Sequence, residues 1–252
     1  MDCSDDLDPV LWMGVFHEII QKEKHRRIVF KNKIFNKVLL TGSFIVTLFI
    51  IAKLSGVLQY AFVPTAGNEP NIKRKSFVFM SNILPYEKFA ILAYNQNNPN
   101  YPGGVYLQRL IGEENDIVLI KDGNLYVNNV LIDQFNVKHS YKIDRAYAND
   151  LSLKGLDDHE IFQMNENDFI TQLSDKELNN NFTYERFINQ NPEQDIIKMY
   201  HKNWSVDNFG PLRIPQGKLF FLGDNRNASL DSRFLGLVDK KEVVGRIFYP
   251  KN

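Results

Sequence analysis

The sequence predicts a mainly β protein, built as a barrel or as packed antiparallel sheets, behind a single N-terminal helix that spans a membrane. Short runs of branched and aromatic residues alternate with turn signals such as Asp122-Gly123, a spacing typical of antiparallel sheets. One long apolar run precedes them. The composition, with 44% hydrophobic and 24% charged residues, is ordinary for a globular chain and excludes wholesale disorder and a polytopic membrane protein.

Charge and metal-ligand content exclude other classes of protein. The 30 basic and 30 acidic side chains cancel, so the chain lacks the strongly basic surface typical of proteins that bind nucleic acid. Cys3 is the single cysteine, which excludes an intramolecular disulfide and a cysteine-based zinc cluster. The five histidines are scattered without the spacing of metal ligands. We therefore expect no nucleic acid, no metal and no cofactor.

A first helix is predicted near the N-terminus. Asp8 and Pro9 suit the cap and the first turn of a helix, and apolar residues follow at helical spacing. They are Leu11, Trp12, Val15, Phe16, Ile19 and Ile20. Two interpretations fit this pattern equally: an amphipathic helix lying on the membrane surface, or a helix that docks against another membrane protein.

The apolar run over residues 38–52 predicts the membrane span. It carries no charge, and it reaches the roughly 20 residues that a bilayer requires only if a flanking lysine extends its side chain to the surface. A buried core helix is the alternative, and a cleaved signal peptide fits poorly because the run starts far from the N-terminus. Seven Lys or Arg residues lie between Lys22 and Lys37, against the single acid Glu23.

Such a basic block marks the cytoplasmic side of a membrane span. We therefore predict a cytoplasmic amphipathic and basic segment over residues 1–37, a transmembrane helix over 38–58 and an extracytoplasmic domain over 59–252.

The domain that follows is predicted to consist mainly of short strands. They are residues 76–80, 90–94, 105–111, 117–120, 125–127 and 218–222. One helix is predicted from Ser174, because Ser174 and Glu177 form a capping-box pattern. Leu178, Phe182 and Phe187 follow at roughly helical spacing. The Asn-rich segment over 141–203 predicts an elaboration of the sheet rather than a separate domain, within a partly helical cap insertion over about 121–214.

A sequence motif near the C-terminus carries a family resemblance. Residues 223–233 have the sequence GDNRNASLDSR. Taken alone this is a polar turn, in which Asp231 and Arg233 are expected to pair elsewhere rather than with each other. The stretch resembles, at eight positions, the signature Gly-Asp-Asn-Arg-x-x-Ser-x-Asp-Ser-Arg of type I signal peptidases. Residues 209–215 and 244–246 are also similar to that family, and the resemblance covers about residues 48–248.

The resemblance implies a signal-peptidase-like antiparallel sheet or barrel on a membrane anchor, and it implies an activity. Family members are serine endopeptidases in which a serine attacks the scissile carbonyl and a buried, neutral lysine takes its proton. The serine motif Pro-Ser-x-Ser-Met-x-Pro-Thr is matched by residues 64–71, with Gly67 at the serine position. The lysine motif Tyr-x-Lys-Arg-x-x-Gly is matched by residues 106–112, with Gln108 at the lysine position. Glycine offers no nucleophile and an amide accepts no proton, so we expect no catalytic residue.

Other positions of the family's site are retained. By resemblance, Thr65 matches the position whose hydroxyl assists the oxyanion hole, and Ser229 matches the serine that orients the lysine. Asp231 and Arg233 match the pair that supports the site from behind. In the family, the precursor's cleavage region lies extended between the strand leading to the serine and the strand carrying the lysine. The residues predicted to flank such a peptide are Phe62, Val63, Pro64, Tyr106 and Leu107.

The resemblance leaves three functions open. The first is a module that binds signal peptides of precursor proteins, and the second is a structural subunit of a secretion assembly, in contact with a Sec-type translocon or another secretion component. The third is an active signal peptidase whose nucleophile has moved to Thr65 or Ser76. The implied location is a bacterial-type inner (plasma) membrane, crossed once, with the N-terminus in the cytoplasm.

Overall fold

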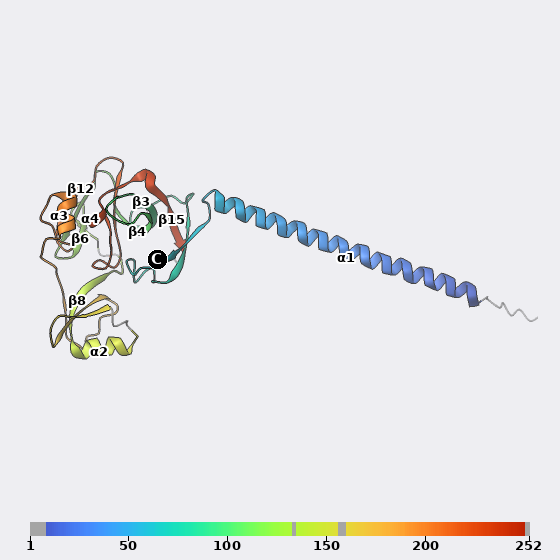
Figure 1. Ribbon diagram of the computed structural model, residues 1–252, viewed down its shortest axis with the longest axis horizontal. Helices are drawn as coiled ribbons and strands as arrows, with labels where there is room; N and C mark the ends of the chain where they lie inside the picture. The colour runs from blue at the N-terminus through green and yellow to red at the C-terminus, as the bar shows by residue number, and fades with distance from the viewer. Residues whose placement is uncertain (1–8, 133–134, 156–159, 250–252) are drawn as a thin grey trace, which may run out of the picture. The chain divides into compact units, whose positions relative to one another are not determined.

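The computed structural model describes residues 9–132, 135–155 and 160–249, and it divides the chain into two units, residues 1–55 and 56–252 (Figure 1). The first unit contains one helix, α1, which runs from Pro9 to Leu54. The predicted helix start at Pro9 is confirmed. The short amphipathic helix is not a separate element, because the helix continues through the basic block into the apolar run. α1 ends four residues before the predicted limit of 58, at a turn where Gly56 has a positive φ of 77°.

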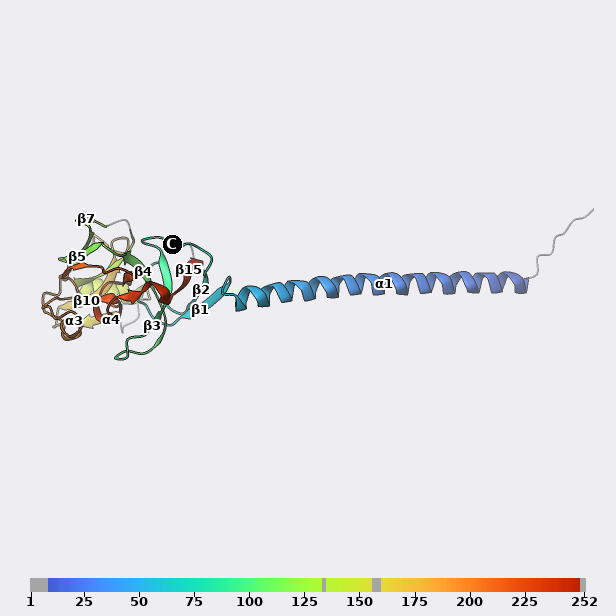
Figure 2. The ribbon, with the colours of Figure 1, turned by 90° about the horizontal axis from the view of Figure 1, so that it is seen from above.

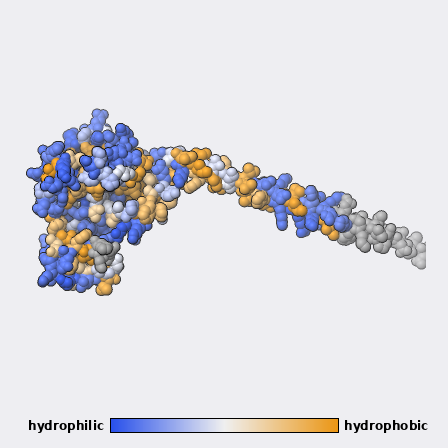
Figure 3. Space-filling model, viewed as in Figure 1, coloured by the Kyte–Doolittle hydropathy of each residue, from blue (hydrophilic) through white to orange (hydrophobic). Residues whose placement is uncertain are grey.

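The apolar part of α1 exposes its large side chains. Within the described residues, Ile20–Leu54 is the stretch long and apolar enough to cross a membrane by length and composition. Val38, Leu40, Phe44 and Ile51 are each more than half exposed. Figure 3 shows this hydrophobic stretch, followed toward the N-terminus by a hydrophilic one. By its length and composition, this helix fits a membrane-anchored protein.

The second unit is built on three antiparallel sheets, which confirms the mainly β prediction (Figure 2). The largest sheet has seven strands in the order β1-β2-β15-β3-β4-β13-β14. Their bounds are β1 Gln59–Val63, β2 Ser76–Ser81, β15 Val243–Tyr249, β3 Ile91–Gln96, β4 Gly104–Gly112, β13 Lys218–Leu222 and β14 Val238–Asp239.

The second sheet has four strands in the order β12-β5-β6-β7. They are β12 Phe209–Arg213, β5 Ile117–Lys121, β6 Asn124–Val127 and β7 Val130–Leu131. A core cluster joins this sheet to β13 and to the short helix α3, Gln194–Tyr200, through buried side chains that include Val118, Phe209 and Phe220. Alternating inward residues therefore pack the second sheet onto the first.

The third sheet, β11-β8-β10-β9, overlaps the polar segment over 141–203 that was predicted to elaborate the fold, and begins three residues before it. Its strands are β11 Tyr184–Arg186, β8 Lys138–Asp144, β10 Asp168–Ser174 and β9 Ile161–Gln163, and it carries the helix α2, Arg145–Leu153. Figure 1 shows β8 and α2 to one side of β3, β4 and β15. A core cluster of its own, including Tyr147 and Leu173, holds this small sheet together.

The helix predicted from Ser174 is wrong. The backbone N–H and the hydroxyl of Ser174 both donate to the Glu177 carboxylate, at 2.7 and 2.8 Å, but these bonds close a turn after β10 rather than a helix. The apolar residues behind it pack sideways instead. Phe182 stacks on Tyr147 with ring centroids 4.8 Å apart, and Leu178 joins the same cluster. Tertiary packing has overridden a local helix signal.

Candidate functional site

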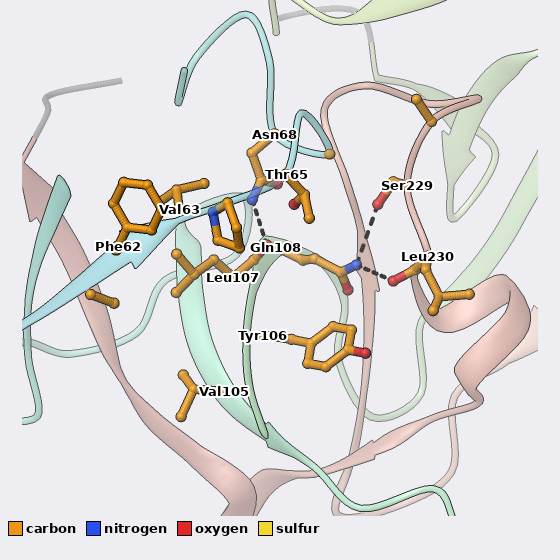
Figure 4. Close-up of a pocket in the computed structure, with 14 residues that line it drawn as sticks. Phe62, Val63, Thr65, Asn68, Val105, Tyr106, Leu107, Gln108, Ser229 and Leu230 are labelled. Atoms are coloured by element: carbon orange, nitrogen blue, oxygen red, sulfur yellow. Dashed lines mark hydrogen bonds between the residues drawn. The ribbon is translucent and has the colours of Figure 1, made fainter. Parts of the chain in front are cut away.

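A groove of about 410 Å³ contains the positions that the sequence singled out (Figure 4). Three segments line it: the end of β1 with the loop after it, the first half of β4, and the loop between β13 and the short helix α4, Ser232–Leu235. All five predicted peptide-flanking residues line the groove, as do Gly67, Gln108, Thr65 and Ser229. The lining residues are Ala61, Phe62, Val63, Pro64, Thr65, Gly67, Asn68, Val105, Tyr106, Leu107, Gln108, Ala228, Ser229 and Leu230.

The two strands beside the groove each leave an edge without a strand partner. β1 pairs with β2 on one side only. β4 pairs with β3 along Gly104–Arg109, whereas β13 pairs with β4 only from Arg109 to Gly112. Among the described strands, none pairs with the second edge of residues 104–108. Unpaired strand edges offer backbone N–H and C=O groups to an added strand.

Gly67 leaves room for a side chain. A Cβ atom built on it would lie 3.5 Å from Ser229 Oγ and 3.8 Å from the Ala228 carbonyl oxygen, which are ordinary contacts. The Gly67 carbonyl accepts a hydrogen bond of 3.0 Å from the Asn225 N–H, so the loop is tied to the signature loop. Gly223 permits this approach, because a Cβ there would collide with Ser229 and with the Gly67 carbonyl.

Gln108 is 4% exposed and fully hydrogen-bonded. Its Nε2 donates to the Leu230 carbonyl at 2.7 Å and to Ser229 Oγ at 3.3 Å, and its Oε1 accepts from the Tyr94 hydroxyl at 2.6 Å. The Leu230 carbonyl can only accept, which fixes the orientation of the amide. Burial, and then the charge of Asp231, raise the pKa of Tyr94 well above its ordinary value, so its hydroxyl stays a neutral donor.

Ser229 connects the two substituted positions. Its hydroxyl lies against the space above Gly67 and also accepts from Gln108. The structure therefore brings positions 67, 108 and 229 together at the groove. Neither glycine nor a fully bonded amide can attack a carbonyl or take a proton.

Two further groove residues differ in how their polar atoms are satisfied. Thr65 is exposed, and its hydroxyl forms no hydrogen bond with any described residue. Asn68 is 5% exposed, and its Nδ2 donates to the Leu107 carbonyl, which joins the loop after β1 to β4. Within the described part of the chain, no donor reaches the buried Asn68 Oδ1. Asn68 was not predicted, because an asparagine in a loop carries no distinctive sequence signal.

Asp231 and Arg233 do not line the groove but lie buried beneath it. They form a mutual ion pair, Nε–Oδ1 2.8 Å and Nη2–Oδ2 2.7 Å, with at most 1% of either side chain exposed. The expectation that they pair elsewhere is wrong. Asp231 caps α4, so the chain turns there rather than running extended, and the two side chains meet. The Asp231 carboxylate also accepts from the Gly223 N–H at 3.1 Å, which holds both ends of the loop.

A second buried ion pair was not predicted. Arg109 donates to both oxygens of Asp224, with Nε–Oδ1 2.7 Å and Nη2–Oδ2 2.6 Å. Asn71 Nδ2 donates to the same carboxylate at 2.7 Å, which ties the loop after β1 into the pair. Both partners stand inside the motifs already identified, so their opposite charges were the available signal. Ser76, one candidate for a moved nucleophile, lies outside the groove lining and donates to the Lys73 carbonyl at 2.6 Å.

Comparison with known proteins decides the family. The family described as "Signal peptidase, peptidase S26" matches residues 36–250, which is most of the chain. The chain belongs to this signal peptidase family. Membership supports a role in protein export, and together with the apolar helix α1 it fits a membrane-anchored protein.

Individual relatives agree in family and differ in coverage. Signal peptidase I of Bacillus licheniformis is 54% identical over 48 residues, 18% of this chain and 26% of that protein. Signal peptidase IB of Staphylococcus aureus is 26% identical over 213 residues, 81% of this chain and 82% of that protein. The chain thus matches about a quarter of the length of the first Bacillus relative. A crystal structure of signal peptidase I from Enterococcus faecalis matches with 23% identity and a TM-score of 0.34, covering 66% of this chain and all of that one.

Proposed function

We propose that this signal peptidase family member is non-catalytic and binds signal-peptide-like segments of exported precursors in its groove. The observation that carries the proposal is the combination of Gly67 and Gln108 at the two reactive positions with an open groove between unpaired strand edges. Such a protein would hold a precursor without cutting it, as an accessory subunit of a secretion assembly.

The loss of chemistry rests on functional groups. A serine-lysine mechanism needs a hydroxyl to form the acyl bond and an unprotonated amine to accept its proton. Position 67 has no side chain. The Gln108 amide nitrogen already donates to Leu230 and Ser229, and its carbonyl already accepts from Tyr94. Thr65 has the one free hydroxyl described on the groove wall, but no lysine or histidine lines the groove to serve as its base.

The ability to bind a peptide rests on the backbone. A segment entering the groove can add to the free edge of β1 or of β4, with main-chain hydrogen bonds supplying affinity. The exposed Thr65 hydroxyl, which has no hydrogen-bond partner among the described residues, is a polar group at the groove wall that a bound segment can satisfy. These features favour a binding role over a purely structural subunit, for which an open groove has no use.

Fluorescence anisotropy with a labelled Ala-x-Ala precursor peptide tests the proposal on the full chain in detergent. We expect saturable binding with the peptide left intact. Gly67→Leu should weaken binding at least tenfold by filling the groove. Gly103→Leu is the matched control, because Gly103 is exposed outside the groove lining and has only one neighbour within 4 Å of an added Cβ. Absence of binding by the unmodified protein would refute the peptide-binding role and leave the structural subunit.

We further propose that the N-terminus is cytoplasmic and the β domain extracytoplasmic, because the basic block precedes the apolar stretch of α1. Protease added to intact spheroplasts should digest the domain and spare an N-terminal tag. Protection of the domain would refute this topology.

A further inference from the structure

A second, smaller pocket lies away from the groove, where the second and third sheets meet. We call it the cap pocket; it has a volume of about 120 Å³ and shares no lining residue with the groove. Its polar lining comes from five places in the chain: β6, β8, the turn after β10, β11 and the signature loop. The lining residues are Gly123, Asn124, Leu125, Leu131, Ile132, Phe135, Val137, His139, Asp175, Arg186 and Arg226.

Arg226 is the unusual member of this lining. It is 5% exposed, yet its guanidinium forms no hydrogen bond or ion pair with any described residue, and its Nε is buried without a partner. Two other buried arginines, Arg109 and Arg233, lie behind the groove, and each donates two hydrogen bonds to a carboxylate. Buried charges in proteins are almost always paired, because nothing offsets the desolvation free energy of an unpaired one. Burial lowers the pKa of Arg226 to about 10, which leaves it a cation at neutral pH.

Charges of both signs act on Arg226: Asp224 and Asp231 raise its pKa, whereas Arg233 and Arg109 lower it. At the neighbouring His139 ring the named charges are all positive. Burial, and then the charges of Arg186, Arg226 and Arg233, lower the pKa of His139 to about 3, so its ring stays neutral. Arg186 is fixed beside it, with Nη2 donating to the Gly123 carbonyl at 2.9 Å and Nη1 donating to Asn124 Oδ1 at 3.0 Å. Asp175 is the one acid among the described lining residues, and its carboxylate accepts from the Tyr141 hydroxyl at 3.0 Å.

We propose that the cap pocket binds a small oxyanion, with Arg226 as its principal ligand and the neutral His139 ring beside it. A guanidinium presents parallel donors that match the oxygens of phosphate, sulfate or a carboxylate. The pocket volume suits an anion of about four or five heavy atoms, and Leu125 and Phe135 are among the apolar residues that line it. The site does not depend on the proposed function of the groove.

The location gives this anion a structural consequence. Arg226 belongs to the same loop as the groove residue Ser229, and β8 holds this loop from the other side. The Lys138 N–H donates to the Asp224 carbonyl at 2.9 Å, and the Arg226 N–H donates to the Lys138 carbonyl at 3.0 Å. An anion on Arg226 therefore ties the third sheet to the loop that forms the groove wall.

Isothermal titration of the full chain with sodium phosphate, sulfate or acetate, at constant ionic strength set with chloride, tests the proposal. We expect saturating heat at one anion per chain, in contrast to the non-specific exclusion of sulfate and phosphate from protein surfaces, which does not saturate. Arg226→Gln should weaken binding at least tenfold. Arg213→Gln, which changes an exposed arginine on β12, should change it less than twofold. Absence of saturable binding, or equal binding by Arg226→Gln, would overturn the proposal.

A measurement on the unmodified protein covers the case in which Arg226→Gln does not fold. The His139 ring resonances, assigned with His139→Gln, should shift during the phosphate titration with the same dissociation constant as the heat. Binding without a shift at His139 would place the anion elsewhere and overturn the proposal. Tighter binding of phosphate or sulfate than of acetate would indicate an inorganic anion, and the reverse order a carboxylate; either order supports the site.

Discussion

Gln108 and Arg109 are neighbours on β4 and are buried to nearly the same extent, but they lie on opposite faces of the strand and have different partners. Successive side chains of a strand point to opposite faces, so Gln108 lines the groove and Arg109 lies behind it against Asp224. Under the proposed function, Gln108 replaces the lysine of the family motif on the groove face, and the arginine of the motif is kept behind it as Arg109. Under the proposed function, the same division separates Gly67, at the position that the family motif gives to the nucleophile, from the buried Asp231–Arg233 pair.

The groups on the two faces of β4 differ in what they contribute: those behind the groove stabilise the fold, and those facing it occupy the reactive positions of the family motif. Each retained arginine has two hydrogen bonds to a buried carboxylate, so removal of one partner would strand a charge. A lysine at position 108 would have no carboxylate partner among the groups that Gln108 contacts. Its burial would destabilise the fold, and it would serve a function only where the amine acts as a base. Once the nucleophile is absent, glutamine keeps the contacts to Leu230 and Ser229 without the cost of a buried charge.

The largest effect is expected behind the groove. Asp231→Ala should lower the free energy of unfolding of the domain by about 3–5 kcal/mol, because it leaves Arg233 as an uncompensated buried cation. The matched control is Asp195→Ala, which breaks the exposed pair with Lys198 and should have a much smaller effect, because solvent screens that pair. Chemical denaturation of both variants measures the difference. Equal effects would show that the buried pair does not support the fold.

A smaller effect is expected on the groove face. Gln108→Lys should destabilise the domain by about 1–3 kcal/mol at neutral pH, since it buries an ammonium and removes the acceptor of the Tyr94 hydroxyl. Desolvation lowers the pKa of the introduced amine in the folded state below that in the unfolded state. The unfolded state then binds more protons between the two pKa values, so the variant should recover stability as the pH rises through this window. Denaturation at pH 7 and pH 10, against the unmodified protein, measures it. A penalty independent of pH would contradict the account.

The smallest effect is expected at the nucleophile position. Gly67→Ser should change the free energy of unfolding by no more than about 0.5 kcal/mol, because an added Cβ meets Ser229 at ordinary contact distances. Gly223→Ser is the matched contrast, since a Cβ there collides with Ser229 and with the Gly67 carbonyl. Thermal unfolding of the two variants should differ clearly. Comparable losses would mean that position 67 has no room for a nucleophile.

The strands of the second unit were predictable because their signals are local. Alternating branched and aromatic residues between turns located β2 to β6 and β13 to within two residues at each end. The sheet order was not predictable, since β15, the last strand, inserts between β2 and β3. β8 and β10 were not predicted, because their polar residues obscure the alternating pattern of a strand. The helix from Ser174 was predicted wrongly, because the turn there has the same capping hydrogen bonds as the start of a helix.

The site was predictable where a motif fixes position and not where distant segments meet. The motif register identified Gly67, Gln108 and Ser229, and the structure places all three at one groove. It could not identify Tyr94, which comes from β3 and satisfies Gln108, nor the unpaired Asn68 Oδ1. The pairing of Asp231 with Arg233 was missed because the cap of α4 bends the chain between them.

The central claim is that the groove has kept its form and lost only its reactive pair. A cleavage assay on an Ala-x-Ala precursor, with the unmodified protein, Gly67→Ser, Gln108→Lys and the double variant, tests it most directly. Groups of one catalytic unit act together, so we expect no cleavage by the first three and measurable cleavage by the double variant alone. Cleavage by the unmodified protein, abolished by Thr65→Val, would contradict the claim and show that the nucleophile has moved.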